Sequence, residues 1–128
     1  MDDQQVREIA AGLFDAIESG DVAAVGDLYT EDVEIWHNYD DAVQNREQNL
    51  ATLAGLVARI SDRKYDKRQV EVFADGFIQQ HVLRGVRADG VQVAMPGVLI
   101  GRLRGDKIAR LDEYLDSAHV AQFRQVAS

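Results

Sequence analysis

Three short turn signals in the C-terminal half of the chain constrain its fold more than any other feature. They are Asp75-Gly76, Asp89-Gly90 and Gly105-Asp106, and each lies between segments in which apolar and polar residues alternate. Such dipeptides supply the positive backbone φ angles that tight hairpins need. This pattern predicts an antiparallel meander of four strands, at about residues 69–74, 77–86, 91–103 and 107–116. A bulge or bend is expected at Pro96-Gly97, because proline cannot donate a hydrogen bond to the ladder.

Helical patterns come before the meander. Apolar residues recur at helical spacing before Gly20, after Asp21 and after Asn45. Asp21 is a suitable N-cap, and Asn45 with Gln48 resembles a capping box. A short strand is expected at residues 33–38, a solvated helix end and loop at 59–68, and a terminal helix at 118–126. Helices separated from strands in this way predict an α+β fold, in which helices pack across one strongly bent antiparallel sheet that encloses a pocket.

Length and composition indicate one domain over residues 1–128. The net charge of −8 disfavours nucleic acid as a partner. The chain has no cysteine, and none of its apolar stretches approaches the roughly 20 residues that span a bilayer. The first residues lack the pattern of a signal peptide. We therefore expect a cytoplasmic protein with neither a membrane nor a nucleic acid as its partner.

The alternation of side chains along a strand places three ionisable groups on apolar faces. Glu113 shares a face with Ala109, Leu111 and Leu115, and His81 shares one with Phe77, Gln79 and Leu83. His37 follows Val33 and Ile35 on the first strand, while Trp36 and Asn38 lie on the opposite face and Tyr39 follows at the strand end. Other readings remain open: a surface position or a salt bridge for Glu113, a hydrogen-bonded core position for His81, a polar turn at 38–40, and a capping or surface position for His119.

If His37, His81 and Glu113 converge, they form an acid–base site. Imidazole titrates near neutral pH, and a carboxylate beside it fixes its tautomer and raises its basicity. The three residues lack the spacing of a known metal motif, although ligands from separate strands could still hold zinc. The sequence contains no phosphate-binding loop, dinucleotide fingerprint or nucleophile elbow. We therefore expect no metal and no cofactor.

Three segments carry a resemblance to a known family: AIESGDVAAVGDLYTEDVEIWHN, REQNLATL and RLRGDKIARLDEYLD. With these, nearly the whole chain resembles the NTF2-like superfamily, in its SnoaL-like or ketosteroid-isomerase-like branch. The resemblance implies a cystatin-like cone, in which three N-terminal helices pack on a strongly bent antiparallel sheet around a deep apolar cavity, and it implies a homodimer. The superfamily contains isomerases, dehydratases, epoxide hydrolases, polyketide cyclases and binding modules, so the fold does not choose among them.

The resemblance also assigns positions. Steroid isomerases of this superfamily carry a catalytic aspartate where this chain has His37. The residues that donate hydrogen bonds to the oxyanion in those enzymes correspond to Leu13 and Leu99, whose side chains have no hydrogen-bond donor. Epoxide hydrolases resembling limonene-epoxide hydrolase carry an Asp-Arg-Asp set at positions similar to those of His81, Gln79 and Glu113. Ile35 and His37 stand where the supporting residues of those hydrolases lie.

Together, the residue pattern and the resemblance predict a pocket for a small hydrophobic molecule and a cofactor-independent isomerase, cyclase or hydrolase. The expected catalytic residues are His37, His81 and Glu113, with His37 or His81 as the base and Glu113 orienting or stabilising the imidazole. The expected ligand-binding residues are Trp36, Asn38, Tyr39, Phe77, Gln79, Leu99 and Leu111. One alternative is a binding module without chemistry. Another is a dimerisation module that pairs through the outward face of Ile78, Gln80, Val82 and Arg84, because an exposed apolar sheet face needs covering.

Overall fold

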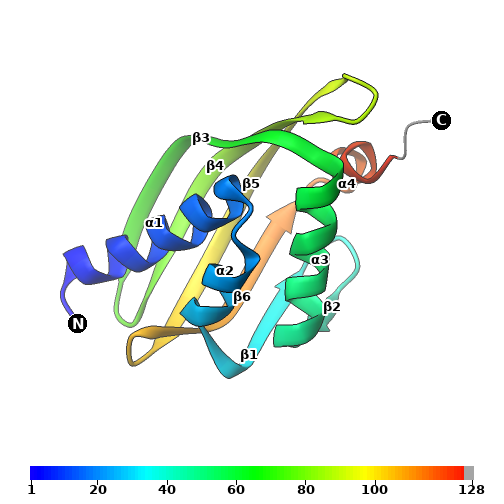
Figure 1. Ribbon diagram of the computed structural model, residues 1–128. Helices are drawn as coiled ribbons and strands as arrows, with labels where there is room; N and C mark the ends of the chain where they lie inside the picture. Colours follow the sequence, from blue (N-terminus) through cyan, green and yellow to red (C-terminus); the bar gives the residue numbers. More distant parts are fainter. Residues whose placement is uncertain (126–128) are drawn as a thin grey trace.

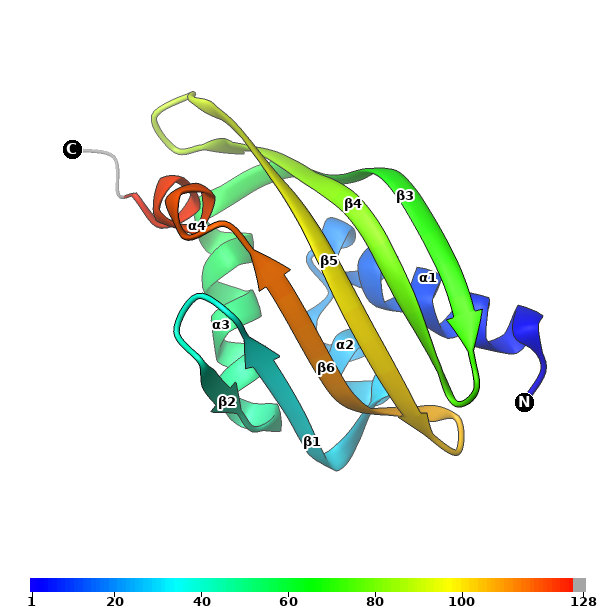
Figure 2. The ribbon, with the colours of Figure 1, turned by 180° about the vertical axis from the view of Figure 1, so that it is seen from behind.

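Helices cover one face of a curved sheet in the computed structural model, which describes residues 1–125. Three helices lie on that face (Figure 1): α1 (Asp3–Ser19), α2 (Val22–Leu28) and α3 (Arg46–Arg59). The strands are β1 (Tyr29–His37), β2 (Ala42–Gln44), β3 (Ile60–Phe73), β4 (Gly76–Arg87), β5 (Gln92–Arg104) and β6 (Lys107–Leu115). A fourth helix, α4 (Ser117–Arg124), lies at one end of the sheet, whose other face carries no helix among the described residues (Figure 2).

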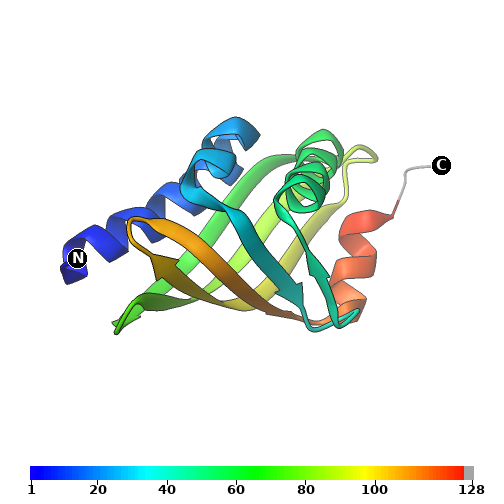
Figure 3. The same cartoon turned by 90° about the horizontal axis from the view of Figure 1, so that it is seen from below.

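The described strands form one six-stranded sheet in the order β2-β1-β6-β5-β4-β3. Seen from below, the sheet curves around the space beneath the helices (Figure 3). The predicted α+β fold is therefore confirmed, with one correction to its topology. Strands β1 and β6 pair in parallel, so the sheet is mixed rather than wholly antiparallel. The chain reaches this arrangement because α3 and the meander separate the two strands in sequence.

Local sequence signals set the helix ends. Asp21 caps α2, and Asn45 forms a capping box with Gln48 at the start of α3. A second capping box, formed by Asp2 with Gln5, begins α1. Gly20 ends α1 in the left-handed conformation, with φ of 80°.

The β3–β4 hairpin needs a glycine because of space and not because of its φ angle. Asp75 itself takes the positive φ, of 63°. A Cβ atom at Gly76 would lie 2.3 Å from the Gly101 carbonyl oxygen, which no larger residue could tolerate without a shift. The other two predicted turns do use positive φ at glycine, at Gly90 and Gly105.

The segment expected as a helix end and loop is instead the first half of β3. Its register against β4 shifts twice, between Ser61 and Lys64 and between Asp66 and Gln69. Asp62 and Lys67 take positive φ within these irregular stretches. β3 is an edge strand of the sheet, so its outward charged side chains remain in water, and this composition disguised the strand.

Four smaller expectations also need correction. β1 begins at Tyr29, directly after α2, rather than at residue 33, and the short β2 was not predicted. The register of β4 with β5 runs without a shift through Pro96, which lies one residue beyond the last β5–β6 pair, Gly97 with Leu115. The proline therefore loses no hydrogen-bond partner on the β6 side, and the expected bulge does not form.

The terminal helix ends at Arg124, and residue 126 of the expected range lies outside the described residues.

The core lies between α1 and the concave face of the sheet. Val6, Ala10, Leu13, Phe14 and Ile17 of α1 are all buried, as their helical spacing predicts. The leucines and Val57 of α3 behave differently, because they are only half-buried and Asn49 is the one fully buried residue of that helix. The space beneath α3 is the reason for this difference.

Candidate functional site

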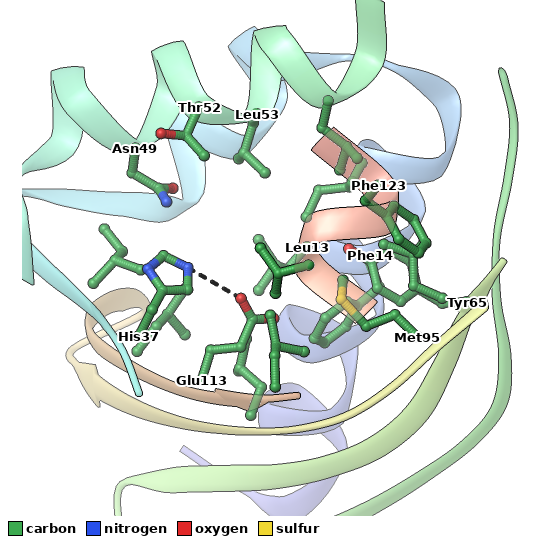
Figure 4. A pocket seen from close by; sticks show the side chains of 18 of the residues that line it. Leu13, Phe14, His37, Asn49, Thr52, Leu53, Tyr65, Met95, Glu113 and Phe123 are labelled. Atoms are coloured by element: carbon green, nitrogen blue, oxygen red, sulfur yellow. Dashed lines mark ion pairs between the residues drawn. The ribbon is translucent and has the colours of Figure 1, made fainter. Parts of the chain in front are cut away.

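A cavity of about 110 Å³ lies between the concave face of the sheet and helices α1, α3 and α4. Most of its lining is apolar, and its polar lining residues are Tyr29, His37, Tyr39, Asn49, Thr52, Arg59, Tyr65, Glu113 and Arg124. Asn49, Thr52 and Leu53 enter it from α3, and Phe123 enters from α4 (Figure 4). An engineered cavity of roughly 150 Å³ binds benzene. The volume therefore suits a guest of about one ring.

His37 and Glu113 meet inside this cavity. His37 Nε2 lies 3.1 Å from Glu113 Oε1 (Figure 4). The carboxylate can only accept a hydrogen bond, so the imidazole Nε2–H is the donor. The side chain of His37 is 7% exposed and that of Glu113 is 19% exposed. Glu113 is thus the member of the pair that is more open to a guest, while His37 is enclosed behind it.

Strand register explains why these two residues meet. His37 on β1 is the direct partner of Glu113 on β6, and Glu113 is in turn the partner of Leu99 on β5. Residues opposite each other on paired strands share a face, so all three side chains point toward the helices. The expectation that strand alternation turns His37 and Glu113 inward is confirmed in its geometry. Leu99, Leu111 and Tyr39 also line the cavity, as expected.

His81 lies apart from this pair. It is buried, and its ring contacts the edges of the Phe14 and Tyr65 rings at centroid distances of 5.0 and 4.7 Å. Its Nδ1 lies 2.9 Å from the side-chain nitrogen of Gln79. Burial lowers the pKa of His81, with a further contribution from the charge of Arg68 and an opposing one from Glu113. His81 is therefore neutral at pH 7 and is not among the residues that line the cavity.

Four residues expected to bind a ligand lie away from the cavity. Trp36 is on the outer face of the sheet, where its indole N–H donates to Asp41 at 2.7 Å. Asn38 accepts a hydrogen bond from the backbone N–H of Leu115 at 2.7 Å. Phe77 and Gln79 do face inward, but each is almost wholly buried and neither lines the cavity. The Phe77 ring fills the space that a side chain at position 101 would occupy, since a Cβ atom at Gly101 would lie 2.5 Å from the ring.

Tyr65 is a cavity residue that sequence reasoning missed, because its segment was expected to be a loop. It enters from β3, on the side of the cavity away from His37 (Figure 4). Burial raises the pKa of the Tyr65 hydroxyl well above its ordinary value, and the negative charge of Glu113 adds to the effect. The hydroxyl therefore stays protonated at neutral pH and can donate a hydrogen bond to a guest.

A second missed group is a hydrogen-bonded set beneath α3. The Tyr29 hydroxyl donates to Asn49 Oδ1 at 2.7 Å, and Asn49 Nδ2 donates to Gln44 Oε1 at 3.1 Å. Burial raises the pKa of Tyr29, again with a contribution from Glu113. A polar Asn49 amid the apolar stripe of α3 was the available signal in the sequence.

Two arginines complete the polar lining. Arg124 of α4 donates to the Tyr39 hydroxyl at 3.0 Å and lies over the Tyr39 ring, 5.2 Å from its centroid. Burial raises the pKa of Tyr39, and the charge of Arg124 opposes this. Arg59 lines the cavity from the last turn of α3. The lining therefore holds one carboxylate and two guanidinium groups.

Two further findings concern residues 1–125 only. Within them, no three His, Cys, Asp or Glu side chains are grouped closely enough to share a metal ion. No helix in that range has the length and apolar character needed to cross a membrane.

Comparisons with known proteins agree with this architecture. The family model described as SnoaL-like domain matches residues 10–111. No curated protein sequence showed significant similarity to the chain.

Solved structures of the same fold are numerous, and three illustrate the likeness. A hypothetical protein with a ketosteroid isomerase-like fold from Catenulispora acidiphila DSM 44928, in complex with trimethylamine, is 20% identical, with a TM-score of 0.79 and 94% of each chain covered. A provisionally assigned polyketide cyclase from Xanthomonas campestris pv. campestris is 19% identical, with a TM-score of 0.81, covering 94% of this chain and 97% of that one. PrhC from Penicillium brasilianum NBRC 6234 is 14% identical, with a TM-score of 0.81, covering 94% and 85%. At these identities the likeness shows the fold alone.

Proposed function

The chain belongs to the SnoaL-like domain family of the NTF2-like superfamily, and on that premise we propose that its cavity binds a small apolar molecule and moves a proton on it. The observation that carries this proposal is the His37–Glu113 contact of 3.1 Å inside an otherwise apolar cavity. The relatives that bind trimethylamine or are assigned as polyketide cyclases support a small guest and this class of chemistry.

The two members of the pair have different roles in this proposal. Glu113 acts as the base, because it is the more exposed side chain and only one of its oxygens is engaged by His37. His37 is a positioning residue, since its Nε2–H holds the carboxylate of Glu113 in place. A carboxylate in an enclosed, water-poor site is also more reactive toward a carbon acid than one in bulk water.

On a guest with a carbonyl group, the first step of the reaction is proton removal. A Glu113 oxygen takes a proton from the carbon next to the carbonyl, and the electron pair of that C–H bond moves to the carbonyl oxygen to give an enolate. The Tyr65 hydroxyl stays protonated in its buried site and is the available hydrogen-bond donor for that oxygen. Return of the proton to the same or another atom completes an exchange or an isomerisation.

Deuterium exchange tests this proposal without knowledge of the natural substrate. Cyclohexanone, a one-ring ketone, is incubated with the protein in D₂O, and loss of its α-proton signal is followed by NMR. We expect the wild type to accelerate exchange and Glu113→Gln to abolish the acceleration, with Trp36→Phe, on the outer face, as the matched control. Binding of cyclohexanone without accelerated exchange would instead indicate a binding module.

Pairing of two copies is a separate proposal. Ile78 and Val82 are half-buried on the outer face of β4, which no helix of the described chain covers. Tyr114 on β6 is 46% exposed. A second copy would cover these side chains, and light scattering at micromolar concentration tests this; a monomer would contradict it.

A further inference from the structure

Arg59 is a cation on the cavity wall that no other described residue neutralises. It takes part in none of the salt bridges formed within residues 1–125, and its Nε atom is buried without a hydrogen-bond partner there. Six of the other ten arginines pair with carboxylates, as Arg68 does with Asp15 and Glu18. Among the described arginines, Arg59 is the one whose Nε atom is buried without a hydrogen-bond partner, and it also lines the cavity. With 22 acidic and 14 basic residues, the chain has enough carboxylates to pair Arg59. An unpaired guanidinium on an enclosed wall therefore needs another explanation.

The helix makes room for this side chain. Gly55 lies one turn before Arg59 on α3, and a Cβ atom at Gly55 would stand 2.9 Å from Arg59 Nη1. The guanidinium thus lies back along the helix, over a position without a side chain. Glycine in a helix interior costs roughly 1 kcal/mol relative to alanine. A methyl group at position 55 would require the Arg59 guanidinium to shift from this place.

A partly enclosed guanidinium without partners favours an anion. Its Nε atom has lost its hydration without gaining a partner, and an unpaired buried polar atom destabilises the empty state. The planar guanidinium matches the two oxygens of a carboxylate. Arg124, on α4, adds a second positive charge to the same lining. Glu113 is the one carboxylate among the lining residues, and His37 engages it.

We propose that the guest of this cavity has an apolar body of about one ring and a carboxylate or similar acidic group, which Arg59 binds. This inference rests on the proposed function in one respect only, namely that a small molecule enters the cavity. It adds a substrate class, the small organic acids, and a residue that selects it.

Paired probes of equal shape test the inference. Benzoate and benzamide have the same ring, but only benzoate is charged. Their affinities are measured by NMR titration at low salt, because salt screens the contact. The proteins are the wild type, Arg59→Gln and Arg102→Gln. Arg102 is the matched control, because it lies over the Phe73 ring, lines no part of the cavity and carries the same charge.

We expect the wild type to bind benzoate about tenfold more tightly than benzamide, the scale of one hydrogen-bonded ionic contact. This preference should vanish in Arg59→Gln and persist in Arg102→Gln. Equal affinities in the wild type, or a preference that survives in Arg59→Gln, would overturn the inference. Benzamide binding would in either case leave the proposed function standing, whereas failure of both probes to bind the wild type would remove both.

A second variant guards against loss of folding. Arg59→Lys keeps a positive charge at the C-terminal end of α3 but lacks the planar fork, so we expect most of the preference for benzoate to be lost while benzamide affinity is retained. An unchanged preference in Arg59→Lys would show that charge alone, without the guanidinium geometry, selects the acid, and would overturn the assigned role of Arg59 in binding both oxygens.

Discussion

His37 and Glu113 are direct partners on two adjacent parallel strands that lie far apart in the sequence, and their side chains meet at 3.1 Å on the concave face of the sheet. Neither strand would place an acid–base pair in the cavity alone. The pair depends on the β1–β6 contact, which joins segments that α3 and the meander separate in sequence. The same contact places Glu113, the one carboxylate among the lining residues, in the cavity.

The first prediction concerns the charge of Glu113. Glu113→Gln keeps the size of the side chain and an oxygen that accepts from His37 Nε2–H, so we expect the free energy of unfolding to change by less than about 1 kcal/mol. Proton transfer should be lost, because an amide does not act as a base at neutral pH. Urea unfolding measures the change in stability, and the cyclohexanone exchange assay measures the loss of proton transfer. A variant that unfolds far more easily would indicate that Glu113 serves mainly to stabilise the fold.

The second prediction concerns pH and His81. Burial holds the pKa of His81 below its ordinary value, so the unfolded chain binds this proton more readily than the folded chain does. The stability contributed by neutral His81 is therefore fully present above about pH 6.5, the unfolded pKa, and decreases as the pH falls below it. Urea unfolding of the wild type and His81→Gln at about pH 7.5 and pH 5 checks this, since the variant should lose less stability on acidification. An equal loss in both proteins would contradict it.

The third prediction concerns the buried Tyr29–Asn49 hydrogen bond of 2.7 Å. Asn49→Ala leaves the Tyr29 hydroxyl without its partner and should lower the free energy of unfolding by about 1–3 kcal/mol. In a double-mutant cycle with Tyr29→Phe, the two losses should not add, because both remove the same contact. Additive losses would show that the two side chains stabilise the fold independently.

The fourth prediction concerns the size of the cavity. Leu53 lines it from α3 and is only half-buried, so Leu53→Phe has space to extend into it. We expect the free energy of unfolding to change by less than about 1.5 kcal/mol, while benzamide binding is lost because the new ring occupies the space of the guest. Undiminished binding in this variant would place the guest elsewhere.

The fifth prediction contrasts the effects of two glycine-to-alanine substitutions on stability. Gly76→Ala should destabilise the β3–β4 hairpin by about 1–3 kcal/mol, because its Cβ atom would lie 2.3 Å from the Gly101 carbonyl oxygen. Gly12 lies in α1, where a Cβ atom would meet only the Leu28 side chain at an ordinary 3.8 Å. Gly12→Ala should therefore stabilise the protein by about 0.5–1 kcal/mol. Thermal unfolding of both variants measures the contrast, and equal effects would contradict it.

Strand alternation predicted which way His37 and Glu113 point, because turn dipeptides fixed the last strand and the apolar pattern fixed its inner face. It could not predict that they touch. That contact depends on the parallel β1–β6 pairing, and the strand order is set by long-range packing that no local pattern records. The same limit applies to His81, which shares the predicted inner face but is covered by Phe14 and Tyr65.

Tyr65 and Arg59 were missed for a different physical reason. Both lie where α3 meets β3, a charge-rich segment whose composition resembles a solvated loop. An edge strand with two register shifts loses the strict alternation on which sequence reasoning depends. Asn49, by contrast, stood out in the sequence as a polar residue within an apolar helical stripe and could have been identified.

A guest in the cavity should lie against the His37–Glu113 pair. Intermolecular NOEs between bound cyclohexanone and the protein check this position, because they place the ring without requiring turnover. We expect contacts from the guest to the imidazole protons of His37 and to the methyl groups of Leu99 and Leu111. A bound guest that contacts only outer-face residues such as Trp36 and Tyr114 would contradict it.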